Sequence, residues 1–368
     1  MSRGAPTLSL RQLNRATLAR QMLLEREPAP VVEAVERLAG MQAQEPRPPF
    51  VGLWSRLAGF RREDLAEALG GYEVVRGPLM RSTLHLLSAA DFAAFRPALA
   101  PALNAAVRVM GPSAKGLDSV EFLPAAVELL EQEPRAYNDL RLLLAERFPG
   151  VNHRALGYAV RTQLPLVMVP TDDPWAFPRV ARFALARGSL GRPIAAEGPP
   201  GPMIRSYLAA FGPAGVADFV AWSGLKRMKP AFEELRPVLD VFRDESGREL
   251  FDIPGAPRPD VDTPAPARFL PEFDNLVLAH ADRSRLLADE HRPGLVTKNL
   301  RVKATFLWDG SVAGTWTVER KRGKATLCIA PFEPLLPKAA RELAEEGERL
   351  LGFSESEGSA LDVKIDAP

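Results

Sequence analysis

Residues 72–87 read YEVVRGPLMRSTLHLL and contain two β-like runs, 72–76 and 81–87, separated by a turn at Gly77 and Pro78. Apolar and β-branched residues are common in both runs, and Gly-Pro is typical of a chain reversal. Helical apolar patterns precede this hairpin at residues 8–24, 31–39, 51–57 and 64–69. Helices followed by a short hairpin predict a winged-helix unit.

The same order of elements recurs further along the chain. A long helical stretch covers residues 89–110, and further helical patterns cover 120–131, 137–147 and 153–162, before strand patterns at 164–169 and 177–185. After a Pro- and Gly-rich linker at 193–202, helical patterns cover 204–211, 216–222 and 228–239, before strands at 241–243 and 249–251. The copies share element order more than sequence, and this order predicts three tandem units.

The last third of the chain changes character. Alternating strand patterns cover residues 302–308, 311–319 and 325–329, followed by a helix at 337–351 and a strand at 361–365. We therefore predict an α+β protein with three winged-helix units and a small antiparallel β-barrel or sheet. The predicted boundaries are 1–112, 113–192, 193–254 and 255–368.

Bulk composition narrows the class of protein. A chain of 368 residues is too long for one core, and a net charge of +1 leaves any nucleic-acid contact to local basic patches. The single Cys328 excludes an intramolecular disulfide and a cysteine zinc cluster. No apolar run approaches the roughly 20 residues of a membrane span, and we expect a cytoplasmic protein. The four histidines lack metal-ligand spacing, and no GxGxxG, Walker or GxSxG pattern occurs, so we expect neither a metal nor a cofactor.

The stretch GMQAQEPRPPF at residues 40–50 places Gln42 and Gln44 between a helix end at Gly40 and a proline-rich exit. Pro46 disfavours a helix before it, so the segment is predicted to be extended, with both glutamines on one face and Ala43 turned inward. Two amides offer two carbonyl acceptors and four N–H donors, which suits the binding of one oriented water but not strong proton abstraction. The alternative interpretation is that the amides cap the preceding helix or fix the loop.

Several motifs together indicate a family. These are Gln42-Ala43-Gln44, MRSTLH at 80–85, FLPEFDNL at 269–276, ADR at 281–283 and VAGTW at 312–316. With them, nearly the whole chain resembles the bacterial winged-helix DNA glycosylases of the AlkZ-like type, whose signature is Gln, a hydrophobic residue and Gln. Ala43 is small for the middle position, and Ser82 stands where glycine is expected.

The resemblance implies three winged helices with a C-terminal β-barrel and the unhooking of interstrand crosslinks. An N7-alkylated purine is cationic and leaves easily, so two glutamines would need only to position water against C1′ of the sugar. We expect a monofunctional, metal-independent glycosylase with an open site, acting as a monomer on double-stranded DNA with alkylated or crosslinked purines. Glu45 is either a general base or a solvated acid.

Basic residues are the predicted DNA contacts. The clusters are Lys226, Arg227 and Lys229; Lys298, Arg301 and Lys303; and Arg320, Lys321 and Arg322. Each is either a phosphate-binding surface or a solvated turn. Arg47 and Arg81 are expected near the lesion. His85 is either a contact to DNA or a packed structural residue.

Two other functions fit the same sequence. One is a non-catalytic winged-helix regulator, although no long dimerisation helix is evident. The other is a self-protection protein that sequesters a DNA-alkylating compound. Release of a free modified base distinguishes a glycosylase from both.

Overall fold

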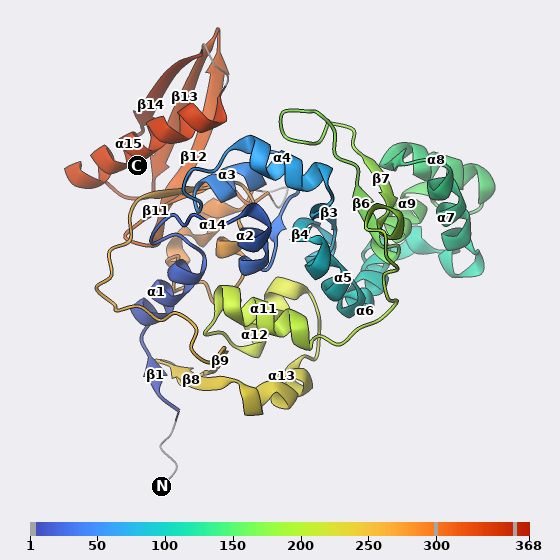
Figure 1. Ribbon diagram of the computed structural model, residues 1–368, viewed down its shortest axis with the longest axis horizontal. Coiled ribbons are helices and arrows are strands. Elements are labelled where there is room, and N and C mark those ends of the chain that lie inside the picture. The colour runs from blue at the N-terminus through green and yellow to red at the C-terminus, as the bar shows by residue number, and fades with distance from the viewer. Residues whose placement is uncertain (1–4, 298–300, 356–358) are drawn as a thin grey trace.

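A computed structural model describes residues 5–297, 301–355 and 359–368 of the chain. Within these residues the fold is α+β, with small sheets surrounded by helices (Figure 1). None of the helices in these ranges is both long enough and apolar enough to cross a bilayer.

The first part of the chain builds the three-stranded sheet β2-β4-β3, which carries the glutamine segment. Its elements are α1 (Leu10–Arg20), α2 (Val31–Arg37), β2 (Met41–Gln42), α3 (Pro48–Trp54), α4 (Arg62–Gly70), β3 (Val74–Pro78), a 3-10 turn (Met80–Ser82) and β4 (Leu84–Ser88). The hairpin predicted at 72–87 is confirmed, but its second strand begins at Leu84. Arg81 and Ser82 lie in the connecting turn, because both have left-handed backbones with φ of 53° and 61°.

The second sheet has the order β5-β7-β6 and lies with its helices on the right of Figure 1. Its elements are α5 (Ala89–Ala98), α6 (Ala100–Ala105), 3-10 segments (Ala106–Ala114 and Leu117–Ser119), α7 (Phe122–Gln132), β5 (Arg135–Ala136), α8 (Tyr137–Arg147), α9 (His153–Gln163), β6 (Leu166–Met168), β7 (Arg182–Leu185) and α10 (Ala186–Ser189). The helical stretch predicted at 89–110 is divided into α5, α6 and a 3-10 segment. Pro97 and Pro101 flank the break at Leu99, since proline removes a backbone donor and crowds the preceding turn.

The third sheet has the order β1-β8-β9 and is completed by the beginning of the chain. Its elements are β1 (Thr7–Leu8), α11 (Gly201–Phe211), α12 (Val216–Ser223), α13 (Lys229–Leu235), a 3-10 turn (Arg236–Val238), β8 (Asp240–Asp244) and β9 (Glu249–Asp252). The two strands predicted around Gly247 are confirmed. Thr7 pairs in parallel with Arg243, a contact that the local pattern did not predict.

The C-terminal part forms a five-stranded sheet in the order β10-β11-β12-β13-β14, with α15 packed on it (Figure 1). Its elements are β10 (Arg268–Leu270), 3-10 turns (Asn275–Val277 and Asp289–His291), α14 (Arg292–Leu295), β11 (Thr305–Trp308), β12 (Ser311–Lys321), β13 (Lys324–Pro331), α15 (Pro337–Ser354) and β14 (Ala360–Ile365). The turns at Asp309-Gly310 and Arg322-Gly323 join β11 to β12 and β12 to β13, and all four residues have positive φ.

Of the two predicted alternatives, barrel or sheet, the structure has the sheet, but the prediction that it is antiparallel throughout was wrong. Within the described ranges β10 and β14 are opposite edges of an open sheet. The last strand runs parallel to β13, because α15 carries the chain back to the starting end of that strand.

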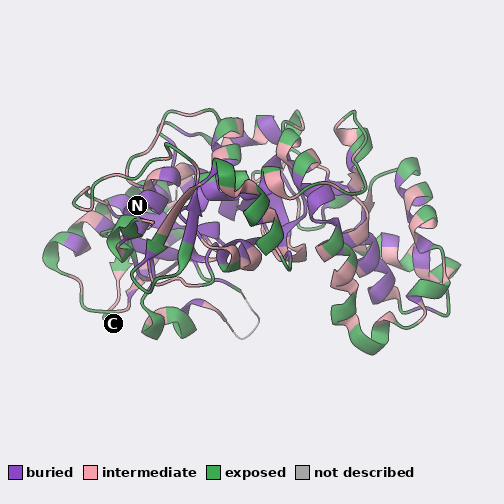
Figure 2. Cartoon of the chain, turned by 90° about the horizontal axis from the view of Figure 1, so that it is seen from below, coloured by how far each residue is buried: buried purple, intermediate pink, exposed green. Residues whose placement is uncertain are grey.

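The cores extend across these sheets, so distant parts of the sequence share buried surface (Figure 2). Phe50 from α3 packs edge-to-face on Trp175, with ring centroids 5.2 Å apart. Val75 and Leu87 from the first sheet belong to the same apolar cluster as Tyr207 and Trp222. The glutamine segment is therefore held from several sides.

Candidate functional site

The glutamine segment begins where α2 ends. Gly40 has φ of 84°, and a Cβ at this position would lie 2.9 Å from the Leu86 carbonyl oxygen. Only glycine fits this turn without strain, and it directs Met41 and Gln42 into β2. The predicted extended conformation is thus confirmed at Met41 and Gln42, and Ala43 is fully buried as predicted.

The strand pairing ends directly after Gln42, where Arg76 binds the backbone. The Ala43 N–H still donates to the Leu84 carbonyl at 2.7 Å. The Ala43 carbonyl instead accepts from Arg76 Nε at 2.8 Å, and the Gln44 carbonyl accepts from Arg76 Nη2 at 3.1 Å. Burial lowers the pKa of Arg76 to about 10, so its guanidinium remains charged near neutral pH. One buried cation therefore fixes the backbone between the two glutamines.

Gln42 lies in β2 opposite His85 and is almost completely buried. Its Oε1 accepts a hydrogen bond from Arg81 Nη2 at 2.7 Å. The second terminal nitrogen of Arg81 donates to the Trp222 carbonyl. Arg81, predicted as a DNA contact, is thus engaged with the protein beside Gln42.

Gln44 is oriented by β4. Its Oε1 accepts a hydrogen bond from the Leu84 N–H at 3.3 Å. In a regular ladder this N–H would donate to the Ala43 carbonyl, which here is bound to Arg76. This contact fixes the loop, which is the alternative role considered for the two glutamines. The side chain of Glu45 is half exposed and pairs with Arg301 at 3.2 Å.

His85 is fully buried between strands β2 and β3. Its Nδ1 lies 3.1 Å from the Thr83 carbonyl. Burial, together with the positive charge of Arg81, lowers the pKa of His85 to about 3, so the ring is neutral. This packed geometry leaves the ring no route to DNA in the present conformation.

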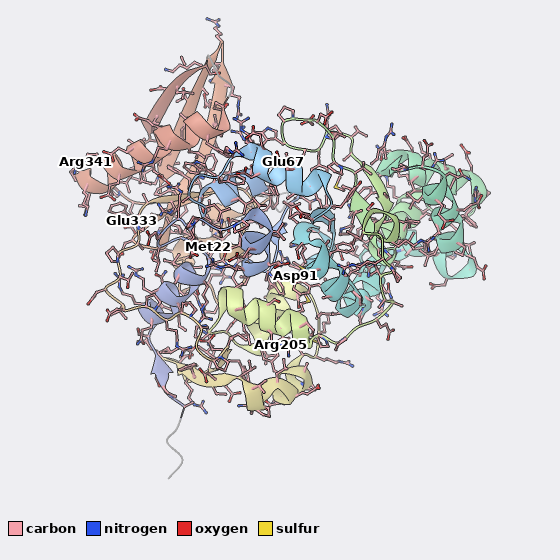
Figure 3. All side chains as sticks on the ribbon, in the orientation of Figure 1. Met22, Glu67, Asp91, Arg205, Glu333 and Arg341 are labelled. Carbon is pink, nitrogen blue, oxygen red and sulfur yellow. The ribbon has the colours of Figure 1, made fainter. Side chains whose placement is uncertain are left out.

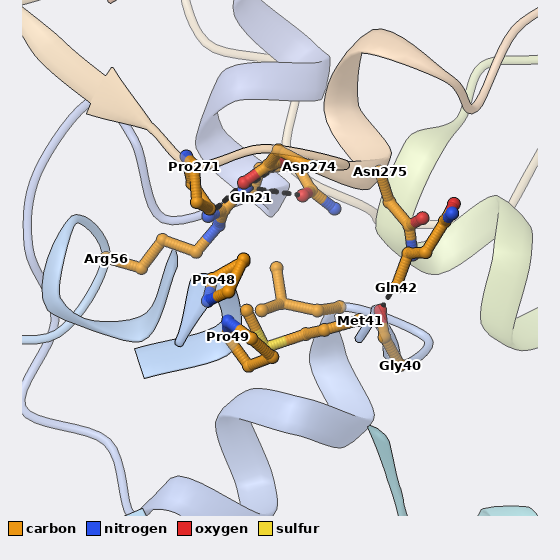
Figure 4. Close-up of a pocket in the computed structure, with 11 residues that line it drawn as sticks. Gln21, Gly40, Met41, Gln42, Pro48, Pro49, Arg56, Pro271, Asp274 and Asn275 are labelled. Carbon is orange, nitrogen blue, oxygen red and sulfur yellow. Dashed lines mark hydrogen bonds and ion pairs between the residues drawn. The ribbon is translucent and has the colours of Figure 1, made fainter. Parts of the chain in front are cut away.

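A small cavity of about 10 Å³ lies against Gln42, a volume close to that of one water (Figure 4). One wall is formed by Pro271, Asp274 and Asn275, which belong to the FLPEFDNL motif at 269–276. Asn275 Nδ2 donates to the Gly40 carbonyl at 3.1 Å, and Asp274 forms a two-pronged ion pair with Arg56, both contacts being 2.9 Å. These buried contacts hold the C-terminal part of the chain against β2.

A larger groove of about 520 Å³ adjoins the cavity, and we call it the arginine groove. Its polar and aromatic lining comprises Glu45, Arg47, Glu272, Arg301, Trp316 and Arg320. Pro48 and Pro271 line both the cavity and the groove, so the two spaces are neighbours. Three predicted DNA contacts from separate parts of the sequence thus meet beside the glutamine segment.

Each of these arginines has a carboxylate partner. Arg47 and Arg320 share Glu355, with the Arg320 contact at 2.7 Å. Burial lowers the pKa of Arg47, whereas the hydrogen bond to Glu272 raises the pKa of Arg301. The arginines are oriented by these pairs toward a common opening.

The remaining predicted basic residues are more dispersed. Lys226, Arg227 and Lys229 are exposed just beyond the C-terminus of α12 and, among the described residues, form no ion pair. Lys303, Lys321 and Arg322 are also exposed, and Lys321 pairs with Glu319 at 2.7 Å. Lys298 lies outside the described residues.

Two residues that shape the site, Arg76 and Trp175, were not predicted from the sequence. Arg76 interrupts an otherwise apolar strand, and that charge in a buried run was a usable signal. Trp175 was also missed: the guanidinium of Arg62 lies 4.8 Å from its ring centroid, and that of Arg47 lies 5.3 Å away. No local pattern connects Trp175 to the glutamine segment, because they meet only in the tertiary fold.

One group of side chains in the described ranges has the spacing of a metal site. Glu290, His291 and Glu333 place ligand atoms within 4.8 Å of one another. None of them lines the cavity beside Gln42 or the arginine groove. Glu333 lies below α15 on the left of Figure 3.

Comparisons with known proteins agree with this architecture. The family model described as "DNA glycosylase AlkZ-like" matches residues 35–353. An interstrand DNA cross-link repair glycosylase from Streptomyces sahachiroi is 24% identical over 371 residues, covering 94% of this chain and 97% of the relative. The solved structure of the DNA glycosylase AlkZ from Streptomyces sahachiroi has a TM-score of 0.79 at 22% identity, covering 98% of this chain and all of that one. The chain belongs to the AlkZ-like DNA glycosylase family.

Proposed function

We propose that the protein is a monofunctional DNA glycosylase that hydrolyses the N-glycosidic bond of N7-alkylated purines, including bulky adducts and interstrand crosslinks. The observation that carries the proposal is the arginine groove beside Gln42, next to a segment that matches the family signature. The relative from Streptomyces sahachiroi, whose name specifies the repair of interstrand cross-links, supports the crosslink substrate.

The proposed chemistry relies on a substrate that is already labile. An N7-alkylated purine carries a positive charge, so the base departs without a strong acid. The enzyme then has to hold water near C1′ and stabilise an oxocarbenium-like sugar. We assign the water to Gln42 and Gln44, with no metal and no lysine nucleophile.

The proposed DNA path follows the arginine groove. Phosphates would compete with Glu355, Glu45 and Glu272 for the arginines, which already point toward one opening. The exposed Lys226, Arg227 and Lys229, and the hairpin tip at Lys321 and Arg322, would extend this surface. An opening of this size suits an adduct that stays outside a tight pocket.

The wider assignment follows from the same proposal. We propose that the chain comprises three winged-helix units, with boundaries near 112, 192 and 254, followed by the C-terminal sheet domain. We also propose that it acts as a monomer on double-stranded DNA in the cytoplasm.

The deciding experiment uses a duplex with a single N7-methylguanine. We expect release of the free base and an abasic site, with activity unchanged by EDTA and no DNA adduct trapped by borohydride. The double variant Gln42→Ala/Gln44→Ala should lose excision while it keeps its circular dichroism spectrum and melting temperature.

Two outcomes would overturn the proposal. Binding of the duplex without base release would favour a regulator or a sequestering protein. Unchanged excision by the double variant would remove the glutamines from the mechanism.

A further inference from the structure

We propose that Arg81 is the positioning residue for Gln42: it fixes the direction of the Gln42 amide and ties it to the C-terminus of α12. This inference rests on the proposed function, because it assigns Arg81 a part in the same reaction.

The orientation of Gln42 follows from hydrogen-bond chemistry. Arginine has donors and no acceptor, so the atom of Gln42 that contacts Arg81 Nη2 at 2.7 Å must be Oε1. The two amide protons on Nε2 then point away from Arg81. Nε2 donates to no described residue, so it is the part of Gln42 that is available to water or substrate.

The environment prevents the amide from turning over. Only 8% of Gln42 is exposed, and β2 holds its backbone opposite His85. Reversing the amide would set two donor groups against each other at 2.7 Å. Polarisation of the carbonyl by a cation also strengthens the opposite N–H groups as donors.

The protein holds both the guanidinium and the backbone of Arg81. Its Nη1 donates to the carbonyl of Trp222 in the last turn of α12, where helix carbonyls lack partners and the dipole favours a cation. A Cβ on Gly224, which has φ of 81°, would lie 3.4 Å from the Arg81 backbone. Arg81 therefore connects the glutamine segment to α12, the helix that precedes Lys226 and Arg227.

The backbone at Arg81 is strained in a way that supports a special role. Arg81 and Ser82 are consecutive non-glycine residues with φ of 53° and 61°. Such conformations are unfavourable for residues with a side chain and persist where the surroundings impose them. They also explain why glycine is the expected residue at position 82.

A direct phosphate contact is the competing role for Arg81. The side chain is partly buried, and both terminal nitrogens are already engaged. Burial, aided by the positive charge of Arg283, lowers the pKa of Arg81 to about 10, so it stays cationic near pH 7. A group used in this way acts on the rate of excision rather than on the affinity for DNA.

The test is a double-mutant cycle with Arg81→Ala and Gln42→Ala, measured by single-turnover excision of N7-methylguanine from a duplex. We expect Arg81→Ala to slow excision by about 10- to 100-fold, the order that a misplaced catalytic group costs, with duplex affinity within about twofold of the unmutated protein. Arg81→Ala should cause no further loss in the Gln42→Ala background, because it acts through Gln42.

Two further variants complete the cycle. Arg81→Lys keeps the charge but reaches fewer acceptors, so it should restore only part of the rate, and it replaces Arg81→Ala in the cycle if that variant does not fold. Arg96→Ala is the matched control, because Arg96 likewise donates to two oxygens, here the backbone carbonyls of Thr162 and Gln163, and burial lowers its pKa to about 10 as well. This control should lose stability without a comparable loss of rate in the folded protein.

The failures are distinguishable. Independent, multiplicative losses in the cycle would overturn the positioning role while leaving the proposed function intact. Weaker binding with a salt slope reduced by about one, and an unchanged rate at saturating DNA, would make Arg81 a phosphate contact. Normal excision by Gln42→Ala would remove Gln42 from the mechanism and overturn this inference while the glycosylase activity stands, whereas no excision by the unmutated protein would overturn the proposed function.

Discussion

Replacement of Arg76 by methionine should damage the site more than the fold. The change removes two charge-assisted hydrogen bonds, to the carbonyls of Ala43 and Gln44, and the cation–π contact to Phe177 at 4.8 Å. Two such bonds contribute about 3–6 kcal/mol in total. Burial lowers the pKa of Arg76 to about 10, and this loss of hydration offsets about 3 kcal/mol of that stabilisation. The free energy of unfolding should therefore fall by only about 0–3 kcal/mol.

The local consequence is larger, because among the described residues only Arg76 donates a hydrogen bond to the Ala43 carbonyl. In Arg76→Met this carbonyl is free to pair with the Leu84 N–H, which would displace the Gln44 side chain. We expect single-turnover excision of N7-methylguanine to slow by at least about tenfold. Urea denaturation measures the stability, and Arg96→Met is the control with equivalent carbonyl contacts elsewhere. The reasoning fails if Arg76→Met keeps the normal excision rate, or if both variants slow excision equally at equal stability.

Three other predictions follow from the same structure. Gly40→Ala should lower the free energy of unfolding, measured by urea denaturation, by about 2–4 kcal/mol, because a left-handed backbone costs alanine about 1–2 kcal/mol and the new Cβ would lie 2.9 Å from its neighbours. Gly59→Ala is the control, since Gly59 has φ of 71° with open space around it, and it should show only the backbone cost. The folded pKa of His85 is about 3, below its unfolded value near 6.5, so between pH 7 and pH 5 the unfolded state takes up a proton that the folded state does not, and the protein loses about 2 kcal/mol of stability. In urea denaturation, the stability of His85→Gln should decline less steeply over this pH range. An equal decline would contradict the buried neutral ring. Arg322→Ala at the exposed hairpin tip should reduce the slope of log affinity against log salt by about one, and an unchanged slope would exclude this tip from the DNA path.

Local rules predicted the parts of the site that local residues determine. Gly40 and Pro46 bracket the glutamine segment, and the extended strand and the buried Ala43 follow from their backbone preferences alone. The hairpin turns at Asp309-Gly310 and Arg322-Gly323 are equally local. The break of the long helix was also predictable, since Pro97 and Pro101 were visible in the sequence.

The orientation of the side chains was not predictable in this way. Arg76 and Arg81 act on the glutamine segment across 32 to 39 positions of the sequence. Arg81 was assigned to DNA because an arginine near a predicted wing resembles a phosphate contact, and only the tertiary fold brings the Trp222 carbonyl to it. The parallel β14 depends likewise on where α15 returns the chain, which no strand pattern records.

The pairing of Thr7 and Leu8 with β8 has a practical consequence for making the protein. During synthesis these residues emerge first, yet their partners at Arg243 and Asp244 appear more than 200 residues later. Thr7 and Leu8 must therefore stay unpaired until β8 has been synthesised. A bulky fusion partner placed directly before Thr7 would hinder that late closure, so a tag after Pro368 is the safer choice for expression.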